Sequence, residues 1–214
     1  ITNAKGEIIA ESISKPDPTP LYDILKKEGD AIFRNASCIA LELGLNRKIL
    51  NTVFSLAERY KKPVYGIIAN LQEAIEWRDF LPRLECFVCN LTEASVFLGR
   101  DYTDYSPKDL IRELPTAMHY ANIKQMIVTL GEKGAVFVDH RGVSGYAKQV
   151  PIVTSYSIGV GEAFFSGIVA ALSCDRSLKD ACLLGNRLAA AKLSTTENVI
   201  PRYQPRELGL KAPW

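Results

Sequence analysis

One short segment of this 214-residue chain combines glycine and acid in a way that suits phosphate chemistry. It reads Gly159-Val160-Gly161-Glu162 and joins a strand-like apolar run to a helix. Glycine lets the backbone approach a ligand closely, and the unpaired N–H groups of a first helical turn attract anions. Glu162 has two open roles: it could cap the helix, or it could accept the proton of a hydroxyl that attacks phosphorus.

Two other turns of suitable composition follow apolar runs along the chain. Asn90 and Glu93 come directly after the run 84–89, and the stretch 129–134, Thr-Leu-Gly-Glu-Lys-Gly, comes after the run that begins at residue 124. A Gly-x-Gly turn alone is weak evidence for a ligand site. Because the carboxyl ends of parallel strands share one edge of a sheet, where such sheets bind ligands, we expect the three turns to meet there.

The elements that must position these turns alternate between strand and helix. Strands are predicted at 36–43, 63–68, 84–89, 124–130 and 135–139, and helices at 21–27, 48–60, 71–79, 92–98, 163–172 and 178–193. A further helix begins at Ser106-Pro107, an N-cap followed by a proline at the first helical position. Repeated β–α units with short links predict an α/β fold, in which a three-layer, mostly parallel sheet carries helices on both faces.

Composition narrows the class of protein. Hydrophobic residues make up 47% of the chain and charged residues 23%, which is ordinary for one globular domain. The formal net charge of +2 is spread without a basic stripe, so we expect no nucleic-acid partner. No apolar run approaches the ~20 residues that span a bilayer, so we expect no membrane partner and a cytoplasmic location. The odd, scattered set of five cysteines predicts reduced thiols.

In this order and spacing, the three turns resemble the motifs of the ribokinase-like (PfkB) carbohydrate kinase family, and the likeness spans most of the chain. The resemblance implies that Asn90 and Glu93 organise Mg²⁺ and its waters near the triphosphate. It implies equally that Thr129, Gly131 and Gly134 line the ATP site. ATP and Mg²⁺ are therefore the expected cofactors.

The same resemblance assigns the catalytic turn. It implies that Gly159, Val160 and Gly161 form an anion hole and that Glu162 is the catalytic base. Asn186 corresponds to a position near adenine in the family, with a surface polar residue as an equal alternative.

The chain also departs from the family pattern. The family's base is normally Asp, and Glu162 is one methylene longer; a misplacement of ~1 Å can cost about a hundredfold in rate. The segment 156–158 reads Tyr-Ser-Ile where relatives carry Asp-Thr-Thr, so we predict no potassium activation. Val160 replaces a smaller alanine, and 66–68 lacks the Asp-Pro of similar kinases.

Compared with the family, residues 1–214 correspond to the carboxy-terminal portion of a ribokinase-like domain. Residues 1–14 are expected to be a remnant of a small β lid, and residues 21–214 the nucleotide-binding α/β core. The resemblance implies that the amino-terminal region that holds the sugar in relatives lies outside these 214 residues.

These expectations give two hypotheses of function. The first is an ATP-dependent phosphotransferase, truncated or divergent, that acts on a sugar or nucleoside hydroxyl; the middle section resembles pseudouridine kinases and suggests that acceptor. The second is a non-catalytic ribokinase-like domain for nucleotide sensing or association. Besides a small-molecule substrate, the expected partners are a fused domain or a second copy of the chain.

Overall fold

The computed structural model describes residues 17–68, 71, 75–149, 158–195, 199 and 205–210. The chain divides into two compact units, one formed by residues 16–130 and 136–145, the other by residues 1–15, 131–135 and 146–214. The predicted lid remnant at 1–14 and the divergent pair Tyr156 and Ser157 lie outside the described residues.

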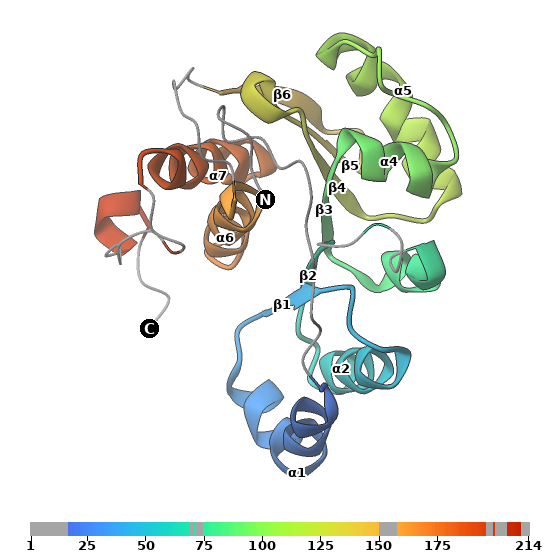
Figure 1. The fold of residues 1–214 in the computed structure, drawn as a ribbon, viewed down its shortest axis with the longest axis vertical. Coiled ribbons are helices and arrows are strands. Elements are labelled where there is room, and N and C mark those ends of the chain that lie inside the picture. Colours follow the sequence, from blue (N-terminus) through green and yellow to red (C-terminus); the bar gives the residue numbers. More distant parts are fainter. Residues whose placement is uncertain are drawn as a thin grey trace. The chain divides into compact units, whose positions relative to one another are not determined.

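A six-stranded sheet runs through the fold in the order of the sequence (Figure 1). Its strands are β1 (Ile39–Glu42), β2 (Val64–Ile67), β3 (Cys86–Asn90), β4 (Gln125–Thr129), β5 (Gly134–Asp139) and β6 (Ser144–Lys148). The first four strands pair in parallel. The links into β5 and β6 are only four residues long, which suits antiparallel neighbours and not parallel ones. The predicted mostly parallel α/β sheet is therefore confirmed.

The helices of the first unit connect the parallel strands, except for α1, which precedes β1. They are α1 (Thr19–Asn35), α2 (Arg47–Arg59), the 3₁₀ segment η1 (Ile75–Arg83), α4 (Leu91–Leu98) and α5 (Pro107–Tyr120). Side chains of Asn46, Asn90 and Ser106 cap α2, α4 and α5, as the polar residues before these helices indicate. α1 is longer than predicted, because Leu25, Gly29 and Phe33 continue its buried face through a polar stretch.

The core of this unit lies on one face of the sheet. Each parallel strand is added on the same side of the previous one, so right-handed crossovers place the connecting helices on one face. Phe54 of α2, Phe87 of β3 and Leu114 of α5 belong to the resulting apolar cluster. All four residues of β3 from Cys86 to Cys89 are buried, so both faces of this strand are covered, as a central parallel strand requires.

The second unit contains η2 (Gly131–Lys133), α6 (Val160–Leu172), α7 (Leu178–Leu193) and η3 (Pro205–Leu208). Helices α6 and α7 pack side by side (Figure 1). Their backbones approach so closely that a Cβ on Gly167 would lie 2.6 Å from Gly185 Cα, while a Cβ on Gly185 would lie 2.9 Å from the Phe164 ring. Glycine at both positions is thus a packing requirement.

Two elements differ from the sequence-based expectations. β6 was not predicted, because its sequence Ser-Gly-Tyr-Ala-Lys is polar and only Ala147 is buried. Of the predicted helix 71–79, Leu71 is helical and residues 72–74 lie outside the described residues, whereas 75–79 belong to the 3₁₀ segment η1, which contains Pro82 and a non-helical Trp77. Proline removes a helical hydrogen bond, which explains the irregular geometry.

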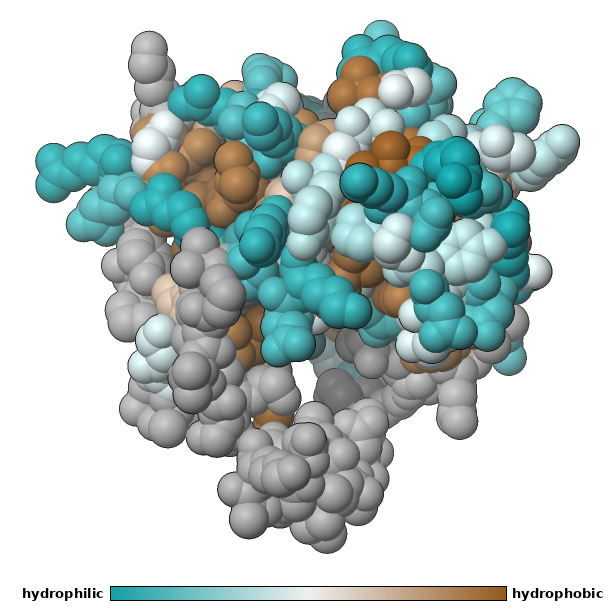
Figure 2. Space-filling model, turned by 90° about the horizontal axis from the view of Figure 1, so that it is seen from above, coloured by the Kyte–Doolittle hydropathy of each residue, from teal (hydrophilic) through white to brown (hydrophobic). Residues whose placement is uncertain are grey.

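On the face seen in Figure 2, hydrophilic residues cover much of the described surface, with smaller apolar areas between them. No helix in the described part of the chain has both the length and the apolar character needed to cross a membrane.

The close approach of α6 and α7 leads to a stability prediction. We expect Gly167→Ala to lower the free energy of unfolding by about 1–3 kcal/mol, because the added methyl group overpacks the contact with Gly185. Helix propensity alone would act in the opposite sense by up to ~1 kcal/mol. The matched control is Gly161→Ala in the same helix, whose Cβ would meet nothing within 4 Å. Urea denaturation of both variants checks the prediction; equal stability of the two would contradict it.

Candidate functional site

Asn90 and Glu93 form a reciprocal capping box at the junction of β3 and α4. Asn90 Oδ1 accepts from the Glu93 backbone N–H at 2.9 Å, and Glu93 Oε2 accepts from the Asn90 backbone N–H at 2.8 Å. A third bond of 2.8 Å runs from Asn90 Nδ2 to Glu93 Oε1. The Asn-x-x-Glu spacing therefore has a local structural reason, since it satisfies the backbone at the start of α4.

The Glu93 carboxyl group is buried, with 9% of the residue exposed. Burial raises its pKa above the ordinary value, and the hydrogen bond from the Asn90 backbone acts against this by stabilising the ionised form. Both carboxylate oxygens are occupied by Asn90, whereas Asn90 itself is exposed. Asn90 is thus the member of the pair that faces outward.

Thr129 lies beside Asn90 at the carboxyl edge of the sheet. The two residues are Cα partners in the parallel β3–β4 register, and Thr129 Oγ1 donates to the Cys89 carbonyl at 3.4 Å. The structure therefore brings together Asn90, Glu93 and Thr129, as the shared edge of parallel strands requires. Glu42, which sequence reasoning did not single out, ends β1 at the same edge, and its Oε1 accepts from the Gly44 N–H at 2.7 Å. The sequence signal that could have identified Glu42 is an acidic residue at the last position of a predicted strand.

The two glycines that follow β4 have different surroundings. Both have positive φ, +60° at Gly131 and +103° at Gly134. A Cβ on Gly131 would meet nothing within 4 Å, but one on Gly134 would lie 2.1 Å from the Ala147 carbonyl oxygen in β6. Gly134 is therefore required by the pairing of the backbone, and open space for a ligand is found at Gly131.

The start of α6 is open and carries no side-chain cap. Gly159 is the N-cap residue with φ of 81°, and the first hydrogen bond of the helix runs from Ala163 N to the Gly159 carbonyl. The backbone N–H groups of Val160, Gly161 and Glu162 precede that bond and have no partner within the helix. Gly161 and Glu162 are exposed, and a Cβ on Gly161 would meet nothing within 4 Å. This is a geometry that admits an anion at the positive end of the helix dipole.

Asn186 is buried inside the second unit, with 8% of the residue exposed. Its Nδ2 donates to the carbonyls of Ala147 at 3.4 Å and Lys148 at 3.3 Å, and its own carbonyl accepts from Gln149 Nε2 at 3.4 Å. The alternative of a surface residue is wrong, because α7 uses Asn186 to hold the end of β6. Its proximity to adenine stays a prediction.

The candidate residues are divided between the two units. Asn90, Glu93 and Thr129 belong to the first, whereas Gly131, Gly134, Gly159–Glu162 and Asn186 belong to the second. That these groups surround one ligand stays a prediction from the sequence.

A magnesium ion would have to be held largely through water. Within the described residues, no group of three or more His, Cys, Asp or Glu side chains could enclose a metal ion. Mg²⁺ usually keeps several of its waters and binds to one or two protein oxygens together with substrate phosphates. The exposed amide of Asn90 fits that outer role, and the buried carboxylate of Glu93 holds Asn90 in place through hydrogen bonds to both carboxylate oxygens.

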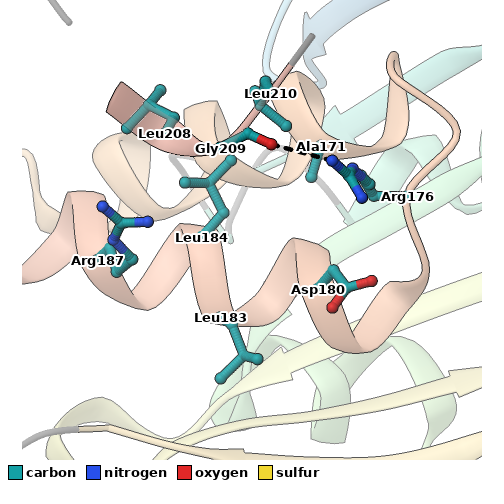
Figure 3. Close-up of a pocket in the computed structure, with 9 residues that line it drawn as sticks. All are labelled: Ala171, Arg176, Asp180, Leu183, Leu184, Arg187, Leu208, Gly209 and Leu210. Carbon is teal, nitrogen blue, oxygen red and sulfur yellow. Dashed lines mark hydrogen bonds between the residues drawn. The ribbon is translucent and has the colours of Figure 1, made fainter. Parts of the chain in front are cut away.

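A pocket of about 210 Å³ lies beside α7 and the segment 205–210 (Figure 3). Arg176 Nη2 donates to the Gly209 carbonyl at 2.9 Å and fixes this segment next to the helix. Ala171, which lines the pocket, is ten residues beyond Gly161, about 15 Å along α6 at 1.5 Å per residue. The pocket is therefore separate from the open start of α6.

Comparisons with known proteins agree with this architecture. A model of the pfkB family of carbohydrate kinases matches residues 17–202. A guanosine-inosine kinase of Exiguobacterium acetylicum is 25% identical over 205 residues, which cover 92% of this chain and 65% of the relative. A ribokinase of Haemophilus influenzae is 26% identical over 178 residues, or 83% of this chain and 55% of the relative. The chain thus spans less than two thirds of the length of either relative.

Solved structures show the same fold. A putative sugar kinase from Clostridium perfringens superposes with a TM-score of 0.72 at 19% identity, over 87% of this chain and 57% of that one. Arabidopsis thaliana ribokinase, in complex with ribose and ATP, gives a TM-score of 0.65 at 17% identity over 80% and 54%.

The buried Glu93 gives a pH-dependent stability prediction. Its folded pKa is raised above the unfolded value of about 4.3, so between these two values the folded protein binds more protons than the unfolded chain. The free energy of unfolding should consequently fall as the pH rises through this window. In Glu93→Gln this contribution should vanish, because glutamine keeps a capping oxygen without a charge. Urea unfolding from pH 4 to 8, with Glu28→Gln as an exposed control, checks this; an identical slope in wild type and Glu93→Gln would contradict it.

Proposed function

Because this chain belongs to the pfkB family of carbohydrate kinases, we propose that it takes part in transferring the γ-phosphoryl group of ATP to a hydroxyl of a sugar or nucleoside. The observation that supports the proposal most directly is the start of α6. There an αL glycine, an uncapped first turn and an exposed carboxylate occur together.

α6 shares the absence of a side-chain cap with α1, which follows Pro18, and differs in this from four other described helices. Asn46, Asn90, Ser106 and Ser177 each accept a backbone N–H at the start of α2, α4, α5 and α7. Gly159 has no side chain for this purpose. Among the described residues these N–H donors of α6 have no partner, so water or a ligand could satisfy them, and a phosphoryl group matches their charge.

In the proposed reaction, the chain contributes positioning and charge. The N–H groups of Val160 and Gly161 stabilise the negative charge on the phosphoryl oxygens as it develops in the transition state. Glu162 accepts the proton of the attacking hydroxyl at its carboxylate oxygen. Asn90, supported by Glu93, would hold a hydrated Mg²⁺, and that ion would supply neutralisation of charge on the phosphates.

The acceptor is proposed to be a ribose hydroxyl. The named relatives are a guanosine-inosine kinase and a ribokinase, and each name contains a ribose or a ribonucleoside substrate. Pseudouridine, suggested by the middle of the sequence, belongs to the same chemical class. Guanosine, inosine, pseudouridine and free ribose are therefore the first acceptors to compare.

A second candidate function is nucleotide binding without catalysis. It is favoured by the residue at position 162, where glutamate carries its carboxylate one methylene farther than the aspartate typical of the family. A domain of this kind would keep the open helix start and bind the nucleotide, but it would transfer no phosphoryl group.

The role of Glu162 is tested by Glu162→Gln in the intact protein. We expect kcat to fall by about 10²–10⁴-fold, the usual contribution of a general base, while ATP affinity stays within twofold. A coupled assay with ATP, Mg²⁺ and each ribose acceptor measures kcat, and calorimetry measures ATP binding. Glu28→Gln, which removes an exposed glutamate on α1, serves as the charge-matched control. Unchanged turnover in Glu162→Gln would overturn the assignment of the base.

The open space above Gly161 is tested by Gly161→Ala. The added methyl group projects where the phosphoryl group is proposed to lie, so we expect ATP affinity or kcat to fall at least about tenfold without loss of stability. The non-catalytic function would be favoured by two results together: the wild-type protein transfers no phosphoryl group, and Gly161→Ala binds ATP more weakly than the wild type. Unaltered binding and turnover would exclude the start of α6 as the phosphoryl site.

A further inference from the structure

A pocket of about 320 Å³ opens in the first unit at the edge of the sheet opposite the candidate site. It is lined at the beginning of three parallel strands: Val64 starts β2, Glu85 precedes β3 and Lys124 precedes β4. Asn90 lies at the other end of β3, five residues from Glu85, or about 17 Å at 3.3 Å per residue. A ligand here would not touch the phosphoryl-transfer residues of this unit.

The pocket has an apolar floor and a charged wall. Phe54, Ala57 and Val64 form the floor and are buried. The charged residues of the wall are four cations and two carboxylates, namely Lys61, Lys62, Arg83, Lys124, Glu58 and Glu85. The formal charge around the opening is therefore +2.

Both carboxylates already have cationic partners. Arg83 binds Glu58 at 2.8 Å, and Lys124 Nζ lies 3.1 Å from Glu85. The Arg83 guanidinium also stacks over the Phe54 ring at 4.7 Å and is only 29% exposed, so its orientation is fixed. Among the described residues no ion pair is formed by Lys61 or Lys62. The excess of positive charge is thus concentrated on these two lysines.

The backbone at Lys61 strengthens the case for a ligand. α2 ends in a Schellman motif, in which Lys61 N donates to the Glu58 carbonyl and Lys62 N to the Ala57 carbonyl. Lys61 occupies the αL position of this motif with φ of 52°, where glycine is usual because it lacks a Cβ. A lysine at this position adopts an unfavourable αL backbone conformation and places its charge at the pocket. The negative end of the α2 dipole favours a cation near this point, but it does not explain why a residue other than glycine occupies the αL position.

We propose that this pocket binds a small polyanion of the phosphate-ester class, separately from the phosphoryl site. Lys61 and Lys62 supply mobile ammonium groups, and Arg83 supplies a fixed, planar donor that suits phosphate oxygens. The apolar floor accommodates the uncharged part of such a ligand. Because the pocket lies at the amino ends of the strands, the ligand acts as an effector and not as a substrate.

The experiment follows ¹H–¹⁵N spectra of the intact protein during titration with pyrophosphate as the probe. We expect shifts at the amides of Lys61, Lys62, Glu85 and Lys124, with saturation that weakens as salt rises. In Lys61→Gln/Lys62→Gln, the affinity at these amides should fall at least tenfold. The control Lys27→Gln/Lys108→Gln removes two exposed lysines elsewhere and should leave the affinity within twofold.

A second variant protects the test against a folding defect. Lys61→Gly removes one charge and places glycine at an αL position, so it should fold at least as well as wild type while it binds pyrophosphate several-fold more weakly. Amide shifts at Gly161 report the phosphoryl site independently. The proposal would be overturned by any of three results. Pyrophosphate shifts only the Gly161 amide, its affinity falls equally in the pocket and control variants, or the shifts at residues 61, 62, 85 and 124 do not saturate.

Discussion

The parallel register of β3 and β4 is the constraint on which the first unit depends. It places Asn90 directly opposite Thr129, so two turns that are 39 residues apart in sequence end side by side at one edge of the sheet. Because Cys86 to Cys89 are buried on both faces of β3, a one-residue shift would exchange the side chains that pack on the two faces, and close-packed interiors tolerate such changes of volume poorly. Asn90 then begins α4 and uses Glu93 to complete its first turn, so the same two residues serve the fold and are available to the proposed chemistry.

The second unit depends on a different contact, the approach of α6 to α7 through Gly167 and Gly185. Burial of Phe164 and Phe165 holds α6 in place from its first turns onward, while Gly161 and Glu162 remain exposed. The phosphoryl-binding turn proposed here is therefore mounted on a rigid helix and left open at its end. Asn186 contributes from α7 by holding the end of β6, which explains its burial without any reference to a ligand.

Several residues of the candidate site thus have structural roles, so their presence in a motif is not by itself evidence for a chemical role. Gly134 is demanded by the Ala147 carbonyl, and Glu93 by the cap of α4. In contrast, no packing contact accounts for Gly131, Gly161 or Glu162, since open space lies next to both glycines and Glu162 is exposed, although the positive φ of Gly131 also favours glycine. The functional hypothesis therefore rests mainly on these three residues, together with the exposed Asn90.

The sequence by itself determined most of the succession of strands and helices, the mostly parallel sheet, the helix cap at Ser106 and the resemblance to the kinase family, because hydrophobic period, capping residues and glycine spacing are local signals. The sequence did not predict the polar β6 or the full length of the polar α1. Both elements are stabilised by contacts with residues that lie outside a short window of sequence. Only the tertiary structure decided that Asn186 is buried and that Gly134 meets Ala147. It alone showed the lysines after α2 gathered with Arg83 and Lys124 around one pocket. These facts depend on residues distant in sequence that packing brings together, and packing is decided by the whole chain.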